Sequence, residues 1–460
     1  MEDLSIYILT SNCARTLIDV DLFADHFFDA LSADARESGA PELIVLSLQE
    51  VAPIAYSFLG GTYLTPYFDA FVKTVKKATT KLWNESFVNL VRDHTGMTGL
   101  MVFARADVLD KIQWIDTAHV GFGVHEMGNK GAVGARLGYV TKGSTSKAVD
   151  LTFVAAHLAP MEDALEQRNL DWKSIVERLV FSHNKNTLGS LQTAPNERSA
   201  LLADQDHDHD HDSAHADKSH EDLFAPNAYL FLAGDLNYRT SNVSPSKTDI
   251  ARFPRYDASP EDPTHYSHLL KEDQLMREMR EGRCFHGLSE PPIDFPPTYK
   301  YSSGAQKAAA HALISGEPDT EWKWSTHRWP SWCDRILYLD HPTGSGTKQD
   351  LHVKPHAYGA LPLFPHSDHR PVALAVSVPL RVKASDNPSQ TNHMVPEAQR
   401  TAPFAIDPSW RSRRNAARRK EIVVGFLAYL SLTWEGNGLL LASSLGLVSA
   451  WIALQSLWGI

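Results

Sequence analysis

The sequence of 460 residues predicts an α/β sandwich that is followed by a membrane-spanning helix. Short apolar runs, typical of buried strands, alternate with segments whose apolar residues recur at helical spacing. Polar side chains capable of chemistry follow several of these runs directly. The final stretch, residues 438–460, carries no charge over 23 positions. Strands and helices mixed in this order are typical of sheets flanked by helices.

The apolar runs define the expected strands in chain order. These are residues 4–10, 43–48, 99–104, 131–140, 151–156, 229–233, 335–339 and 372–378. A helix is expected over residues 22–31, because Phe23, Phe27 and Leu31 recur at intervals of four. A second, longer apolar stripe predicts a helix over residues 164–181.

Polar residues adjoin the expected strands at one end. Asn12, Glu50, His157 and Asp235 follow strands, and Asp368 with His369 comes just before the last one. If these strand ends converge on one rim of the sheets, the side chains form a single site on a rigid scaffold.

Composition excludes some classes of protein. The net charge of −11 disfavours a nucleic-acid-binding protein, which usually carries a basic excess. The 3 cysteines are far apart, so we expect a reducing compartment and no disulfide framework. The N-terminal segment lacks a basic region and a long apolar run, so we expect no secretory signal and a catalytic part facing the cytosol.

Two segments have biased composition. Residues 204–222 alternate His and Asp, which predicts a disordered surface insert, with transition-metal chelation as the alternative. Residues 381–421 are expected to form a flexible linker that ends in a basic cluster. That cluster places six positive charges within RSRRNAARRK, residues 411–420, and is able to attract anionic lipid.

Residues 422–460 are expected to be a membrane anchor, because Glu435 is their only charged residue. The uncharged run 438–460 is long enough to cross a hydrocarbon core of about 30 Å. The basic cluster before it places the preceding domain on the cytosolic side. Residues 422–434 would either lie in the membrane interface or form the first arm of a hairpin. The alternative for the uncharged run is a buried core helix.

The polar residues suit hydrolysis of a phosphate monoester. This reaction needs a carboxylate that accepts a proton from water and donors that stabilise the phosphoryl oxygens. Mg²⁺ would neutralise charge, and it takes only one or two carboxylates from a protein. Glu50, Asp235, Asn237, His157 and the Ser367–His369 segment supply these groups.

Five segments together resemble the inositol polyphosphate 5-phosphatases of the endonuclease/exonuclease/phosphatase superfamily. They are GNKGAV (128–133), LAGDLNYR (232–239), PTYKY (297–301), WPSWCDRIL (329–337) and SDHRPV (367–372). The resemblance spans about residues 4–378 and implies a two-layered β-sandwich flanked by helices.

The resemblance also implies roles for the polar residues around the cleaved phosphate. Glu50, helped by Asn12, would hold Mg²⁺, and Asp235 would be the base that deprotonates water. Asn237 would position the nucleophile or a phosphoryl oxygen, and Asp368 would support the metal side.

Three further residues would act on the phosphoryl group, by the same resemblance. His157 and His369 would stabilise its oxygens, and Asp334 would orient His369.

The resemblance implies a second set of residues that bind the phosphates that are not cleaved. Tyr299, Lys300 and Arg328 would contact the 4-phosphate. Lys130, with its neighbour Asn129, would lie at the 1-phosphate side. Arg239 would add a positive electrostatic potential at the site. Thr326 and His327 stand where the family often has Lys, which is a departure that weakens the expected grip on a 4-phosphate.

The expected activity is removal of the 5-phosphate of phosphatidylinositol 4,5-bisphosphate at a cytosolic membrane face. Resemblance to small tail-anchored members implies that the protein is located in the endoplasmic reticulum. The sequence does not indicate any protein partner. The alternatives are a nuclease of the same superfamily, a sphingomyelinase-like phosphodiesterase and an inactive membrane tether.

Overall fold

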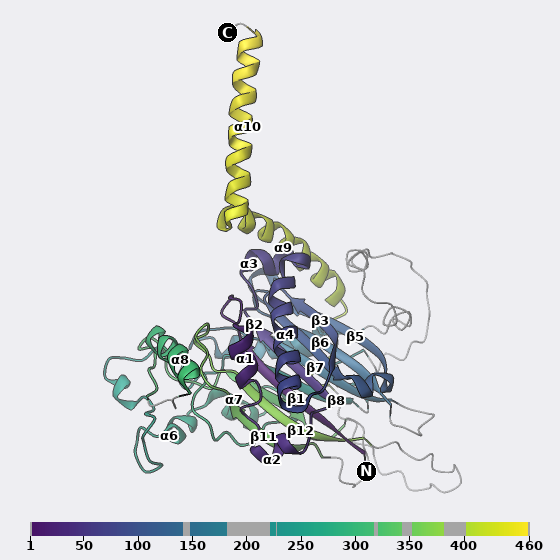
Figure 1. The fold of residues 1–460 in the computed structure, drawn as a ribbon, viewed down its shortest axis with the longest axis vertical. Coiled ribbons are helices and arrows are strands. Elements are labelled where there is room, and N and C mark those ends of the chain that lie inside the picture. Colours follow the sequence, from purple (N-terminus) through teal and green to yellow (C-terminus); the bar gives the residue numbers. More distant parts are fainter. Residues whose placement is uncertain are drawn as a thin grey trace, which may run out of the picture.

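Two six-stranded sheets pack face to face at the centre of the molecule (Figure 1). The computed structural model describes residues 2–140, 148–181, 221–226, 228–316, 321–342, 352–380 and 402–458. Sheet A has the strand order β11-β12-β1-β2-β4-β3, and sheet B has the order β5-β6-β7-β8-β10-β9. The predicted two-layered sandwich flanked by helices is confirmed.

The strands of both sheets include all of those predicted. Sheet A consists of β1 (Glu2–Asn12), β2 (Leu43–Gln49), β3 (Phe87–Thr95), β4 (Thr98–Arg105), β11 (Lys354–Ala360) and β12 (Val372–Leu380). Sheet B consists of β5 (Ile112–Gly121), β6 (Gly131–Tyr139), β7 (Val149–His157), β8 (Ala228–Asp235), β9 (Leu288–Ser289) and β10 (Asp334–Leu339). Strands β3, β5, β9 and β11 were not predicted. They lie at the sheet edges, where one face meets solvent and no continuous apolar run is needed.

Helices cover the outer faces of both sheets. On sheet A lie α1 (Val20–His26) and α4 (Thr65–Trp83), and on sheet B lies α5 (Leu165–Arg178). The expected helix over 22–31 ends at His26, because the Phe27 carbonyl accepts a hydrogen bond from the Tyr7 hydroxyl at 2.6 Å. The shorter helices are α2 (Ala33–Glu37), α3 (Ile54–Leu59), α6 (Tyr266–Leu270), α7 (Gln274–Arg280) and α8 (Ser303–Ser315), with 3-10 turns η1 (Gly61–Tyr63), η2 (Ala106–Lys111), η3 (Val124–Glu126) and η6 (Asp249–Arg252).

Strand register places the polar strand ends side by side. In sheet B, His157 pairs with Gly131 on one side and with Asp235 on the other, and Asp235 pairs with Asp334. In sheet A, Asn12 pairs with Gln49. Since β1 runs parallel to β2 and β7 parallel to β8, their carboxyl ends meet at the same edge of each sheet.

Apolar side chains from both sheets fill the space between them. Ile8, Val45, Val133 and Phe231 are all at most 2% exposed there. Burial of such a side chain contributes about 1.5–3 kcal/mol to folding. Close to the polar edge, the Ser47 hydroxyl donates to the Ala233 carbonyl at 2.8 Å and joins the two sheets.

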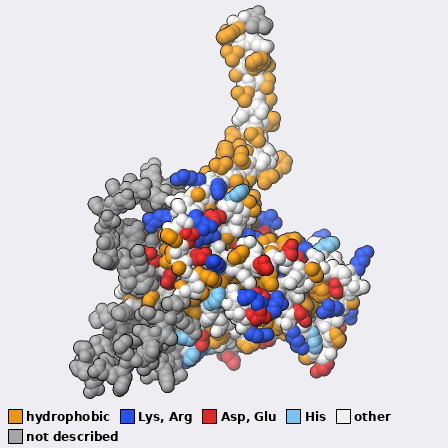
Figure 2. Space-filling model, turned by 180° about the vertical axis from the view of Figure 1, so that it is seen from behind, with side chains coloured by type: hydrophobic (Ala, Val, Ile, Leu, Met, Phe, Trp, Pro, Cys, Tyr) orange, Lys and Arg blue, Asp and Glu red, His pale blue; other side chains and the backbone are white. Residues whose placement is uncertain are grey.

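Two helices end the chain. Helix α9 (Trp410–Leu432) packs on α3, and α10 (Trp434–Trp458) projects away from the body (Figure 1). Within the described ranges, α10 is the one helix long and apolar enough to cross a membrane. Figure 2 shows its surface covered by hydrophobic side chains, with Lys and Arg side chains gathered near its base.

The C-terminal region differs from the expected linker and anchor. Helix α9 runs across the expected boundary at residue 421, so the basic cluster is helical and continuous with the start of the expected anchor. Before it, the Asp407 amide donates to the Glu177 carbonyl at 2.9 Å, and Phe404 packs on the ring of His286. Residues 381–401 of the linker and 204–220 of the insert lie outside the described residues.

Candidate active site

Asp235 lies at the centre of the polar edge. It ends β8 and is 2% exposed, and its Oδ2 accepts a hydrogen bond from the Asn12 amide at 3.0 Å. The same oxygen lies 3.3 Å from Nε2 of His157 and 3.9 Å from Nε2 of His369. Residues from β1, β7 and β8 and from the segment before β12 therefore meet around one carboxylate.

Asp334 holds the His369 ring in place from the side opposite Asp235. Its Oδ2 lies 2.9 Å from Nδ1 of His369 and accepts a hydrogen bond from the Thr298 hydroxyl at 2.7 Å. The carboxylate fixes the proton on Nδ1, so the Nε2 edge of the ring is directed to the Asp235 side. Thr298 was not predicted, although it belongs to the PTYKY segment.

The central acid and its histidine carry opposite charges at neutral pH. Burial alone would raise the pKa of Asp235, but His369 and His157 hold that pKa well below its ordinary value. Burial alone would lower the pKa of His369, but Asp334 and Asp235 raise it to about 9. Asp235 is therefore ionised, while His369 is cationic.

His157 and Lys130 form a second pair beside Asp235. The Lys130 Nζ lies 2.7 Å from Nε2 of His157. Burial, together with the Lys130 charge, lowers the pKa of His157, and burial lowers the pKa of Lys130 as well. The imidazole is thus neutral at physiological pH, and its Nε2 faces both an ammonium and a carboxylate.

Glu50 follows β2 directly and faces the same edge. Its backbone has φ +48°, in the left-handed region, and its half-buried carboxylate lies 3.0 Å from Nε of Arg15. The negative charge of Glu50 raises the pKa of both Lys130 and His157 against the effect of burial. Glu50 therefore adds negative charge to the electrostatic environment of Lys130 and His157.

Asn237 and Arg239 are buried under the site. The Asn237 backbone has φ +58°, and its amide Nδ2 donates to the Leu158 carbonyl at 3.1 Å. Its Oδ1 accepts from the Arg239 guanidinium. That guanidinium also stacks over the ring of Tyr299, 4.5 Å from the centroid, and the Tyr299 ring lies 4.5 Å from that of His369.

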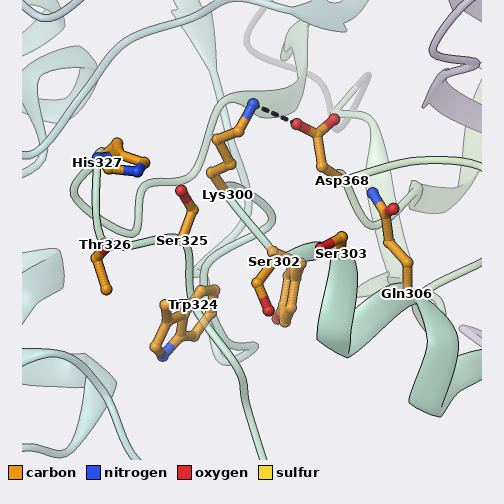
Figure 3. A pocket seen from close by; sticks show the side chains of 10 residues that line it. Lys300, Ser302, Ser303, Gln306, Trp324, Ser325, Thr326, His327 and Asp368 are labelled. Atoms are coloured by element: carbon orange, nitrogen blue, oxygen red, sulfur yellow. Dashed lines mark ion pairs between the residues drawn. The ribbon is translucent and has the colours of Figure 1, made fainter.

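A surface pocket of about 460 Å³ opens beside Asp368 (Figure 3). Lys300 lines it, and its Nζ lies 2.5 Å from Oδ2 of Asp368. Thr326 and His327 form part of the opposite wall. Arg328 does not line this pocket; its Nε lies 3.6 Å from Glu162, in the loop that follows His157.

The geometry agrees with a match to a known family. A family model described as Endonuclease/Exonuclease/phosphatase family 2 covers residues 9–375, which include every predicted site residue. The chain belongs to this family. Its fold is similar to the crystal structure of the inositol polyphosphate 5-phosphatase domain of SPsynaptojanin with inositol (1,4)-bisphosphate and calcium, with a TM-score of 0.54, 20% identity, and coverage of 92% of this chain and 90% of that one.

Curated relatives of this family member are inositol polyphosphate 5-phosphatases. The type II enzyme 15 of Arabidopsis thaliana is 28% identical over 355 residues, which cover 74% of this chain and 28% of the relative. The type I enzyme 13 of the same plant is 31% identical over 284 residues, covering 60% of this chain and 22% of the relative. The chain thus spans about a quarter of the length of these relatives.

The donors at the site of this family member suit a hard divalent cation. The carboxylates of Glu50, Asp235 and Asp368 are oxygen donors, which Mg²⁺ prefers. The amide oxygen of Asn12 accepts a hydrogen bond from the Ala14 amide at 3.0 Å, while its Nδ2 faces Asp235. Asn129 Oδ1 is buried and accepts no hydrogen bond among the described residues. The oxygen donors present therefore suit a magnesium ion by their chemistry.

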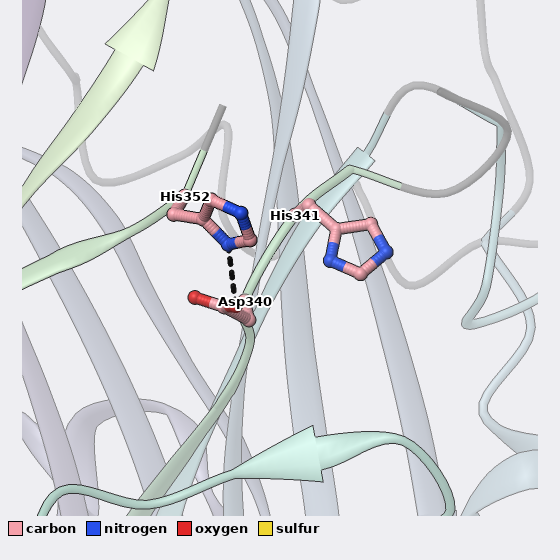
Figure 4. A group of neighbouring side chains, drawn as sticks. All are labelled: Asp340, His341 and His352. Carbon is pink, nitrogen blue, oxygen red and sulfur yellow. Dashed lines mark hydrogen bonds and ion pairs between the residues drawn. The ribbon is translucent and has the colours of Figure 1, made fainter. Parts of the chain in front are cut away.

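A second polar group lies at the other end of β10. Asp340, His341 and His352 lie together there (Figure 4), and Oδ2 of Asp340 lies 2.6 Å from Nδ1 of His352. This pair joins the chain after β10 to the chain before β11. Asp340 is separated from the site by the full length of the strand that begins at Asp334.

Proposed function

We propose that this member of the endonuclease/exonuclease/phosphatase family is a Mg²⁺-dependent phosphoinositide 5-phosphatase. It converts phosphatidylinositol 4,5-bisphosphate to phosphatidylinositol 4-phosphate. The observation that carries the proposal is the ionised Asp235 held among Asn12, His157 and His369. The names of the curated relatives and the Lys300 ammonium in the pocket beside Asp368 support the choice of an inositol phosphate.

The reaction is attack of water on the 5-phosphorus with cleavage of the bond to the inositol oxygen, which takes up a proton and leaves as a hydroxyl while inorganic phosphate is released. Asp235 orients the water and accepts its proton, since its low pKa keeps it ionised. The cationic His369 and the Lys130 ammonium stabilise the charge that develops on the phosphoryl oxygens. Mg²⁺, held by Glu50 and Asn12, supplies further charge neutralisation when bound.

The pocket of Lys300 receives the 4-phosphate. The Lys300 ammonium exchanges its bond with Asp368 for the substrate phosphate, and charge-assisted bonds of this kind are about twice as strong as neutral ones. His327 adds a second cation only when protonated. Lys130, which lies 2.7 Å from His157, is assigned to the cleaved phosphate instead of the 1-phosphate side expected for it. Asn129 keeps the 1-phosphate side, where the lipid would continue into the membrane.

Helix α10 anchors the enzyme in a membrane, and the domain lies on the cytosolic side. Its 25 residues are long enough to span a hydrocarbon core of about 30 Å. The packing of α9 on α3 favours a single span over a hairpin. Among organelles, we propose the endoplasmic reticulum.

A positional panel of lipids tests this function. The purified full-length chain in mixed micelles is given phosphoinositides that differ in the positions of their phosphates, with Mg²⁺ or with EDTA. We expect Mg²⁺-dependent phosphate release from lipids that bear a 5-phosphate, and none from abasic DNA or sphingomyelin. Cleavage of DNA, or release of phosphocholine, would instead support the alternatives.

A further inference from the structure

Helix α9 contacts two segments that contain or closely follow residues of the site. One is α3, which begins four residues after Glu50. The other is the segment 123–130, which ends in Asn129 and Lys130 and which we call the phosphate loop. Helix α3 lies at the end of the molecule from which α10 projects (Figure 1), and α9 contacts both segments.

Glu421 of α9 makes the central contact with the phosphate loop. Its side chain is buried, with the residue 6% exposed, and Oε1 accepts a hydrogen bond from the Gly128 amide at 2.7 Å. The two residues are 293 positions apart in the chain. A buried carboxylate that accepts a backbone amide forms one of the stronger hydrogen bonds in a protein.

Two other bonds hold the same loop against α9. The Arg413 Nε donates to Oε1 of Glu126 at 3.0 Å, and Lys420 reaches the His125 carbonyl at 3.5 Å. Part of the basic cluster therefore forms contacts with the body of the protein. Residues 125, 126 and 128 of the loop are therefore all hydrogen-bonded to side chains of α9.

A short path of backbone bonds leads from Gly128 to Glu50. The Gly128 carbonyl accepts from the Met97 amide at 3.0 Å, and the Met97 carbonyl accepts from the Val51 amide at 3.2 Å. Gly128 is also wedged against the β3–β4 turn, because an added Cβ would lie 2.7 Å from the Gly96 nitrogen. Gly128 is thus packed against this turn and hydrogen-bonded to both Glu421 and Met97.

Helix α9 is seated closely on α3. An added Cβ at Gly425 would lie 2.8 Å from Cβ of Phe58, so the two helices touch at backbone distance. Arg418 donates to the Phe58 carbonyl at 2.7 Å, and the ring of Tyr429 contacts that of Tyr63 at 5.5 Å. This seat fixes Glu421 relative to both site segments.

We infer that Glu421 is a positioning residue that holds the phosphate loop, so that the tail helix α9 is a working part of the active site as well as a link to the anchor. The inference rests on the proposed function, because it assigns the Lys130 loop to substrate. Loss of the Glu421 bond leaves the buried Gly128 amide unpaired and frees Lys130 to leave its place beside His157.

The first test compares variants of the full-length chain in detergent with soluble inositol 1,4,5-trisphosphate. Glu421→Ala should lower kcat/KM about tenfold, the cost of one lost bond to a charged group. Glu421→Gln keeps an acceptor and should stay within about twofold of wild type. Glu435→Ala removes the same kind of side chain at an exposed position of the tail and should have no effect.

A double-variant cycle separates positioning from general damage. The cycle compares Glu421→Ala in the wild type and in a Lys130→Met variant. If Glu421 acts through Lys130, adding Glu421→Ala to Lys130→Met should change kcat/KM less than about twofold. Losses that multiply would overturn the inference, as would a Glu421→Gln variant as impaired as Glu421→Ala.

Hydrogen exchange gives a readout that needs no activity. Gly425→Val should displace α9 and increase amide exchange in residues 123–130, whereas Gly438→Val, where an added side chain meets open space, should not. Unchanged exchange in both Gly425→Val and Glu421→Ala would overturn the inference. A wild-type chain that releases no phosphate would overturn the proposed function; an active wild type with a fully active Glu421→Ala would overturn this inference alone.

Discussion

His369 and Asp334 form a buried pair in which Nδ1 of the imidazole lies 2.9 Å from Oδ2 of the carboxylate. Burial disfavours the imidazolium, yet Asp334 and Asp235 raise the pKa of His369 to about 9. The ring therefore presents a fixed positive charge to the side where Asp235 lies. A phosphoryl group placed there meets an acceptor for the water proton and a cation for its own oxygens.

Asp334→Asn should shift the alkaline limb of the pH profile of kcat/KM to lower pH. His369 is cationic below its pKa and loses the charge as pH rises through it. Without the Asp334 charge that pKa falls, so the limb of kcat/KM should move to lower pH by at least about one unit. Thr298→Val keeps the charge and removes only the bond to Asp334, so it should shift the limb less. A limb that stays in place in Asp334→Asn would remove His369 from this role.

Asp235→Asn should abolish most of the turnover. The amide cannot accept the proton of the attacking water, and loss of a general base costs at least about 100-fold in rate. Single-turnover phosphate release with saturating enzyme measures this step directly. Asp340→Asn is the matched control, because it changes the same side chain at the far end of β10. Near-normal turnover in Asp235→Asn would reject the assignment of the base.

Lys300→Ala should change specificity more than turnover. Its ammonium is the cation of the pocket beside Asp368, so KM for lipids with a 4-phosphate should rise about tenfold, the cost of one charge-assisted bond. Lipids without a 4-phosphate should be affected much less. Lys323→Ala, which removes an exposed lysine paired with Glu321, is the control. Equal effects on both kinds of lipid would exclude Lys300 from recognition.

The site could be predicted because its residues adjoin apolar strands. Asn12, His157 and Asp235 end apolar strands, and the parallel register of β7 and β8 brings His157 beside Asp235. Face-to-face packing of the two sheets then adds Asn12 from β1. The Asn237 amide was not foreseen as part of a structural network, because its partner is the Leu158 backbone carbonyl, which carries no side-chain signal.

The C-terminal region was predicted less well, for a physical reason. Composition indicates that α10 is apolar, but it does not show where α9 docks. The seat of Glu421 is a backbone amide 293 residues away, and a glycine there leaves no pattern of charge or hydrophobicity. Helix α4 was not predicted either, although Phe68, Phe71 and Val75 lie at helical spacing on its buried face.

Removing residues 434–460 should release the enzyme from membranes and leave its activity on soluble substrate within about twofold. The cut falls after α9, so Glu421 and Gly425 keep their contacts with the body. Flotation with liposomes and turnover of inositol 1,4,5-trisphosphate measure the two effects. Membrane association that persists after the cut would show that α10 is not the main anchor.

The identity of the product from phosphatidylinositol 4,5-bisphosphate tests the central claim most directly. With Mg²⁺ present, the full-length wild type should yield phosphatidylinositol 4-phosphate, resolved from its 5-phosphate isomer by chromatography, and Asp235→Asn should yield almost none. Formation of phosphatidylinositol 5-phosphate, or the same yield from Asp235→Asn as from wild type, would contradict the account.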